Sequence, residues 1–86
     1  MKKVYYLTSP TCVKCKIVSN WWNAFVESHT SFNFTVVDTS LSLDEARLFG
    51  VQELPGFVVV SENGAMLGKL TGSPYIDDLE EMLKKV

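Results

Sequence analysis

The pattern of apolar and polar positions divides the chain into seven predicted elements. Short apolar or β-branched runs predict strands over residues 3–8, 34–37, 57–61 and 66–70. Apolar residues at helical spacing predict three helices: a long one from about Cys12 to Val26, a short one ending near Phe49, and a last one that begins at Pro74. The order β-α-β-α-β-β-α predicts an α/β fold, and 86 residues leave room for one domain, residues 1–86.

Small polar residues, glycine and proline mark the predicted boundaries of these elements. Thr11 stands where a residue could cap the first helix, and Ser73 followed by Pro74 has the pattern of a cap and first turn for the last helix. The pair Asn63-Gly64 predicts a tight hairpin between the last two strands.

Composition and charge exclude several classes of partner. Ten acidic and eight basic side chains give a net charge of −2, which is too balanced to favour nucleic acid or a membrane surface. The apolar run after Lys2 and Lys3 is only about four residues, whereas a signal peptide needs roughly 7–15. No run approaches the roughly 18 apolar residues of a membrane span. We therefore expect a soluble, cytoplasmic protein, and we expect it to be a monomer.

The only two cysteines, Cys12 and Cys15, lie between the first predicted strand and the first predicted helix. In this context a Cys-x-x-Cys pair is typical of a thiol–disulfide redox site. A thiolate at a helix start is stabilised, which lowers its pKa below the free value of about 8.5. We therefore expect Cys12 to attack a substrate disulfide, and Cys15 to resolve the mixed disulfide and leave a Cys12–Cys15 bond.

Other interpretations of the cysteine pair are a structural pair, chance spacing or a metal site. Structural zinc takes four ligands, and the chain offers two cysteines and one histidine, His29. An iron–sulfur cluster within one chain lacks ligands in the same way, while a metal or cluster shared between two chains stays open. We predict no metal and no cofactor beyond the redox-active disulfide.

Lys14 and Lys16 flank the second cysteine. They can serve solubility as exposed charges, or they can stabilise the Cys12 thiolate further and favour acidic partners.

A second candidate feature is Leu54-Pro55, which stands directly before the third predicted strand. A cis bond here would expose the Leu54 backbone beside the cysteines, where an extended substrate could pair with it as an added strand. An ordinary trans proline at the start of a strand is the alternative. Gly72, before the last helix, either clears space near this groove or serves the turn.

These motifs together resemble the thioredoxin/glutaredoxin family over nearly the whole chain. The resemblance rests on Thr11-Cys12-Val13-Lys14-Cys15-Lys16, Leu54-Pro55, Asn63-Gly64 and Thr71-Gly72. It implies a thioredoxin fold, with a four-stranded mixed sheet in the order 2-1-3-4, helices on both faces and a cis proline at Pro55. It also implies catalytic Cys12 and Cys15 and a substrate-binding set made of Thr11, Val13, Lys14, Leu54, Pro55, Gly72 and Ser73.

Within this family the chain resembles most a minimal, glutaredoxin-sized thioredoxin-like redoxin, and its motifs are mixed. The length is similar to that of glutaredoxins, but Ser9 and Pro10 stand where glutathione-binding members have a lysine. Thioredoxins carry Gly-Pro between the cysteines and a buried aspartate on the first strand, where this chain has Val13-Lys14 and Tyr6. Small redoxins that supply electrons to ribonucleotide reductase are also similar, through the Cys-Val-x-Cys site.

Three functions follow as hypotheses. The first is a thiol–disulfide oxidoreductase that reduces disulfide-containing protein substrates and takes electrons from thioredoxin reductase or glutathione. The second is a docking module with the same fold that makes little use of its cysteines. The third is an oxidant or isomerase, which the absence of an export signal disfavours.

Overall fold

Four strands and four helices make up the fold in a computed structural model that describes all 86 residues. In chain order they are β1 (Lys2–Thr8), α1 (Val13–Ser19), α2 (Trp22–Ser28), β2 (Phe32–Asp38), α3 (Leu43–Phe49), β3 (Gly56–Val60), β4 (Met66–Thr71) and α4 (Ile76–Lys85). The sheet order is β2-β1-β3-β4, with β1 and β2 parallel and the other pairs antiparallel. The predicted α/β architecture and strand order are confirmed, with four helices in place of three.

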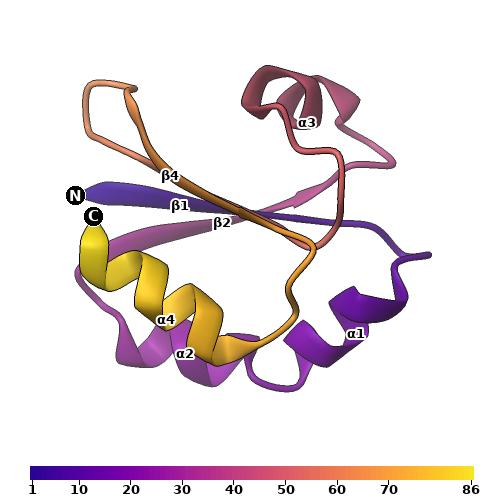
Figure 1. The fold of residues 1–86 in the computed structure, drawn as a ribbon, viewed down its shortest axis with the longest axis horizontal. Coiled ribbons are helices and arrows are strands. Elements are labelled where there is room, and N and C mark those ends of the chain that lie inside the picture. Colours follow the sequence, from indigo (N-terminus) through magenta and orange to yellow (C-terminus); the bar gives the residue numbers. More distant parts are fainter.

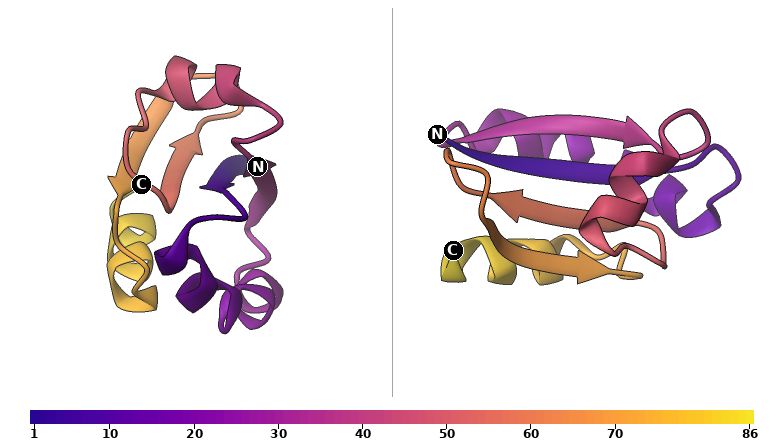
Figure 2. Two further views of the ribbon diagram at one scale, coloured as in Figure 1. Left: turned by 90° about the vertical axis from the view of Figure 1, so that its right-hand side faces the viewer. Right: turned by 90° about the horizontal axis from the view of Figure 1, so that it is seen from above.

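The helices cover the two faces of the sheet unequally. Helices α1, α2 and α4 lie against one face, here called the three-helix face, and α3 lies alone against the other, the α3 face (Figure 1). Figure 2 shows the strands side by side, with α3 crossing them near one end. All five residues of β3 are buried because this central strand is covered on both sides.

The single long helix predicted for residues 12–26 is wrong, because the helix breaks at Asn20 and Trp21. The backbone of Trp21 leaves helical geometry, with φ −124° and ψ −6°. At the break the N–H groups of Asn20 and Trp21 donate to carbonyls three residues back, at 3.2 and 3.1 Å. The break lets the Trp21 indole donate to the carbonyl of Pro74 at 3.1 Å, which ties α2 to the loop before α4.

Two predicted helix caps are also wrong. The first helix is capped by Cys12 rather than Thr11. The last helix is capped by Tyr75 and starts at Ile76, so Ser73 and Pro74 lie in the preceding loop. The Ser73 hydroxyl hydrogen-bonds to the Asp78 carboxylate and accepts from the Tyr75 N–H, which makes a short turn in place of the predicted cap.

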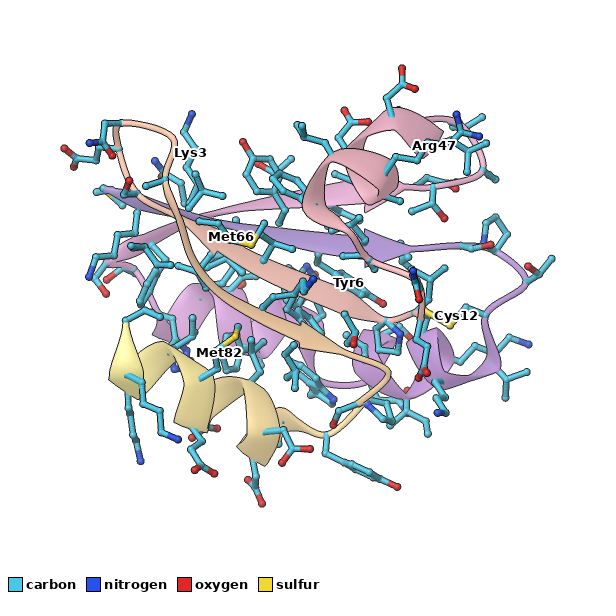
Figure 3. All side chains as sticks on the ribbon, turned by 45° about the horizontal axis from the view of Figure 1, so that its top comes forward. Lys3, Tyr6, Cys12, Arg47, Met66 and Met82 are labelled. Carbon is cyan, nitrogen blue, oxygen red and sulfur yellow. A yellow bond between two sulfur atoms is a disulfide. The ribbon has the colours of Figure 1, made fainter.

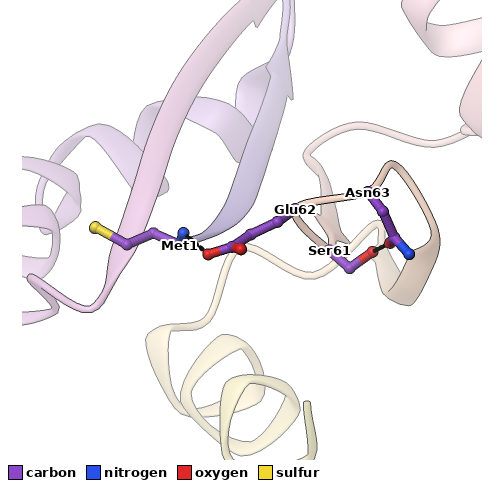
Figure 4. Close-up of polar contacts among 4 residues, drawn as sticks. All are labelled: Met1, Ser61, Glu62 and Asn63. Carbon is purple, nitrogen blue, oxygen red and sulfur yellow. Dashed lines mark hydrogen bonds and ion pairs between the residues drawn. The ribbon is translucent and has the colours of Figure 1, made fainter.

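The hairpin between β3 and β4 forms where Asn63-Gly64 predicts it, with Gly64 at φ 91°. Ser61 bonds to Asn63 within the turn, and the amino group of Met1 pairs with the Glu62 carboxylate (Figure 4). The hydrogen bond from this amino group, and then its charge, lower the pKa of Glu62. These contacts lie at the end of the sheet away from the cysteines, so they stabilise the hairpin and have no contact with the cysteine pair.

None of the helices has the length and apolar character needed to cross a lipid bilayer.

Candidate active site

The two cysteines lie where β1 leads into α1. Cys12 is partly exposed and has an extended backbone, with φ −81° and ψ 111°, and a turn in which its N–H bonds to Ser9 brings it there. Cys15 lies in the first turn of α1 and is 5% exposed. The two residues form a disulfide with their Cα atoms 5.2 Å apart. Figure 3 shows these sulfur atoms at the edge of the molecule, with Cys12 labelled.

A backbone donor faces the sulfur of Cys12. The N–H of Cys15 lies 3.1 Å from Cys12 Sγ and donates to it. A hydrogen bond to a sulfur that becomes negative on reduction stabilises the thiolate. The first turn of α1 contains no acidic residue that would oppose this charge. The geometry therefore leaves Cys12 accessible and Cys15 sheltered.

The Leu54–Pro55 bond is cis, in agreement with the position that the family resemblance implies. Pro55 is buried, and its carbonyl accepts a hydrogen bond from the Gly72 N–H at 2.9 Å. Neither the N–H nor the carbonyl of Leu54 makes a hydrogen bond within the chain. The free polar groups of Leu54 are therefore open to a bound extended segment.

Lys14 connects the cysteine helix to this second loop. Its ammonium group donates to the carbonyl of Gly72 at 3.2 Å, and both residues belong to the predicted substrate-binding set. Gly72 has φ 77°, a left-handed backbone conformation that strains other residues, so the turn favours glycine here. The predicted residues Lys14, Gly72 and Pro55 are thereby joined in one hydrogen-bonded chain of contacts.

The remaining predicted site residues differ in exposure. Val13 is 75% exposed beside Cys12, and Thr11 is exposed in the preceding loop. Ser73 is partly buried, with its hydroxyl engaged by the first turn of α4. Tyr75, which follows it, is 63% exposed. Val13 therefore places apolar surface beside Cys12, where a protein substrate could pack, and Tyr75 exposes an aromatic ring at the start of α4.

Lys16 makes no hydrogen bond or ion pair through its ammonium group and is exposed on α1. The structure holds no cluster of three or more His, Cys, Asp or Glu side chains that could bind a metal ion.

Tyr6 is a site residue that the sequence alone did not connect to the cysteines. Its hydroxyl lies 3.4 Å from the carbonyl oxygen of Cys15 and 3.3 Å from Thr8 Oγ1. Burial raises the pKa of Tyr6, and the hydrogen bond with Thr8 opposes that shift in part. The available signal was its register, because Val4 and Tyr6 share one face of β1 just before the strand ends.

Comparison with known proteins assigns this arrangement to a family. The family model for thioredoxin matches residues 2–85, so the chain belongs to the thioredoxin family. The SPbeta prophage-derived thioredoxin-like protein YosR of Bacillus subtilis is 29% identical over 80 residues, which span 93% of this chain and 92% of that protein. Its size is therefore close to that of the present chain.

Solved thioredoxins share the fold. Mitochondrial thioredoxin 3 from Saccharomyces cerevisiae, in its oxidised form, superposes with a TM-score of 0.87 at 25% identity, over 99% of this chain and 78% of that one. The thioredoxin of Schistosoma mansoni gives 0.87 at 25% identity, over 98% and 77% of the two chains. A thioredoxin domain with a Cys12–Cys15 disulfide supports thiol–disulfide oxidoreductase activity.

Proposed function

We propose that this chain is a dithiol–disulfide electron carrier that reduces disulfides in other proteins. The observation that carries the proposal is the asymmetry of the pair: Cys12 is accessible with an N–H aimed at its sulfur, and Cys15 is buried beside it. Such a pair is suited to two successive thiol–disulfide exchanges.

The chemistry proceeds in two balanced steps. The Cys12 thiolate attacks one sulfur of the substrate disulfide, breaks that S–S bond and releases the first substrate thiolate. The Cys15 thiolate then attacks Cys12 Sγ, breaks the mixed disulfide and releases the second substrate thiolate. The substrate gains two electrons, the chain loses two, and each released thiolate takes up a proton.

The contacts around Leu54 support a protein as the substrate. An extended segment next to the substrate disulfide can form backbone hydrogen bonds with the free N–H and carbonyl of Leu54. Val13 and Tyr75 would contact apolar side chains of that protein, and Thr11, Lys14 and Ser73 would lie along the same surface.

The return of electrons is part of the same proposal. Thioredoxin reductase or glutathione would reduce the Cys12–Cys15 disulfide after each cycle. Membership of the thioredoxin family favours the reductase as the donor. Supplying thioredoxin reductase or glutathione alone, and measuring reduction of the Cys12–Cys15 disulfide, distinguishes the two donors. We place the protein in the cytoplasm, where such donors keep thiols reduced.

The first test is the reduction potential of the pair, measured in a series of glutathione redox buffers. We expect a value near or below about −230 mV, which marks a reductant. A value well above about −180 mV would instead assign the protein to oxidants or isomerases. Failure to form the intramolecular disulfide would remove the redox function and favour a docking module.

Two matched variants test the assigned roles. Cys12→Ser should abolish the reduction of a disulfide-bonded protein such as insulin. Cys15→Ser should retain the first exchange and accumulate a mixed disulfide with the substrate, visible as a covalent adduct on a non-reducing gel. Equal behaviour of the two variants would contradict the division into nucleophile and resolving thiol.

A further inference from the structure

Tyr6 and Cys15 are the only ionisable side chains that the fold buries, at 5% exposure each. They lie in contact through the Tyr6 hydroxyl and the Cys15 carbonyl oxygen, 3.4 Å apart. The two exchange steps described above use Cys15 and leave Tyr6 without a role. A buried polar side chain directly against a reacting residue therefore needs an explanation.

The Tyr6 ring is packed between the sheet and α2 by two aromatic neighbours. It stacks on Phe57 with ring centroids 5.1 Å apart and packs against Trp22 at 4.7 Å. The hydroxyl accordingly has a fixed place at the end of a rigid side chain. A phenol carries one proton, so Tyr6 donates to Cys15 while the Thr8 hydroxyl, 3.3 Å away, can donate to the phenol oxygen.

This contact is the only hydrogen bond between α1 and the strands of the sheet. The other bonds of α1 run within the helix and its ends, apart from the one from Lys14 to Gly72 in the loop after β4. Val18 adds an apolar contact between α1 and the core of the three-helix face. The Tyr6 hydroxyl therefore makes the only polar contact that holds the first turn of α1, which carries Cys15, against the sheet.

We propose that Tyr6 is a positioning residue for the resolving step, holding Cys15 so that its sulfur stays within reach of Cys12 Sγ while Cys12 is bound to substrate. This inference rests on the proposed function, because it concerns the second exchange. Attack on a disulfide sulfur depends on alignment of the attacking thiolate, so a loosened turn slows this step. The first exchange does not use the Cys15 sulfur and depends on Cys15 only through its N–H, which donates to Cys12 Sγ, so we expect a smaller effect on that step.

Tyr6 acts here through the Cys15 backbone and not as a base. Burial raises the pKa of the Tyr6 phenol, so it keeps its proton and remains a donor at neutral pH. The proton of the Cys15 thiol passes to solvent or to the first substrate thiolate released, and the electrons follow the two exchanges already given.

The experiment uses the reduced protein and the aromatic disulfide DTNB, which releases a coloured thiolate at each exchange. The wild type should release two thiolates per chain in two phases. In Tyr6→Phe, which removes only the hydroxyl, we expect the second phase to slow about fivefold, the effect of one buried hydrogen bond, and the first phase to slow much less. Tyr5→Phe is the matched control, because Tyr5 packs on Phe49 across the sheet, and both of its phases should match the wild type.

The possible outcomes distinguish a failure of the role assigned to Tyr6 from a failure of the proposed redox function. Release of a single thiolate by the wild type would overturn the proposed function itself. Two normal phases in Tyr6→Phe, or equal slowing of both phases, would overturn the role of Tyr6 alone. Thr8→Val provides a second check: it should leave the second phase at the wild-type rate, and slowing equal to that of Tyr6→Phe would show that the hydroxyl acts through Thr8.

Discussion

The two faces of the sheet are built from different side chains. The core of the three-helix face contains nine buried residues, including Tyr6, Trp22, Phe25 and Phe57. The core of the α3 face contains five, and all of them are aliphatic. Helix α3 itself has no buried residue, and its partly buried Ala46 and Phe49 supply its contact with the sheet.

The candidate site is divided between these two cores. The cysteine helix rests on the three-helix face through Val18, and Tyr6 beneath it belongs to the same core. Leu54, whose backbone makes no hydrogen bond within the chain, packs instead against the core of the α3 face. The cysteine turn is thus supported by the aromatic core, and the Leu54 loop by the smaller aliphatic core.

The largest effect should come from Phe57→Ala. Phe57 is fully buried and stacks with Tyr6 and Trp21. Loss of such a ring costs about 3–5 kcal/mol, a large part of the roughly 5–15 kcal/mol that stabilises a typical domain. Denaturant unfolding should show this loss, and Phe49→Ala, on the α3 face, should lose clearly less. Equal losses would remove the distinction between the faces.

Two adjacent valines give a finer comparison. Val58 and Val59 are both fully buried in β3 but belong to opposite cores. Val59→Ala should cost about 2 kcal/mol, because three packed helices cannot close the cavity that it leaves. Val58→Ala should cost about 1 kcal/mol, since the lightly packed α3 can move inward. Unfolding curves of the two variants test this order, and a larger loss for Val58→Ala would reverse it.

The sequence predicts the frame of the molecule better than the contacts that cross it. Short apolar and β-branched runs, the Cys-x-x-Cys pair and Asn63-Gly64 are local signals, so the strands, the cysteine turn and the hairpin could be placed. The break at Trp21 could not, since the apolar stripe continues through it. The contact that accompanies the break, from the Trp21 indole to Pro74, joins residues 53 positions apart.

The same reasoning applies to the candidate site. Cys12 at a helix start follows from its neighbours in sequence, and so does its distinction from Cys15. The bond between Tyr6 and Cys15 depends on how α1 is seated on the sheet, and the bond from Lys14 to Gly72 joins residues 58 positions apart. Periodicity within one element carries no information about such pairs.

Alkaline pH should lower the free energy of unfolding through Tyr6, which belongs to the core of the three-helix face. Its folded-state pKa is raised above the ordinary tyrosine value of 10.0 because burial disfavours the phenolate. As pH rises, the unfolded chain loses this proton first, so the free energy of unfolding is unaffected by Tyr6 below about pH 10 and falls as pH rises from there through the folded pKa. Denaturation midpoints against pH should show this loss in the wild type and in Tyr5→Phe, and a smaller loss in Tyr6→Phe. An unchanged alkaline loss in Tyr6→Phe would contradict the assignment.

The smallest effect should come from the outer surface of α3. Leu48 is 78% exposed and belongs to neither core, so its replacement removes little buried apolar surface. Leu48→Gln keeps a residue of similar helix propensity, and the free energy of unfolding should change by no more than about 0.5 kcal/mol. Denaturant unfolding measures this directly, with Leu79→Ala, a fully buried leucine of α4, as the contrasting variant at about 2–5 kcal/mol. A loss for Leu48→Gln close to that of Leu79→Ala would mean that the exposed surface of α3 contributes as much to the free energy of unfolding as the core of the three-helix face, which contradicts the difference between the two faces.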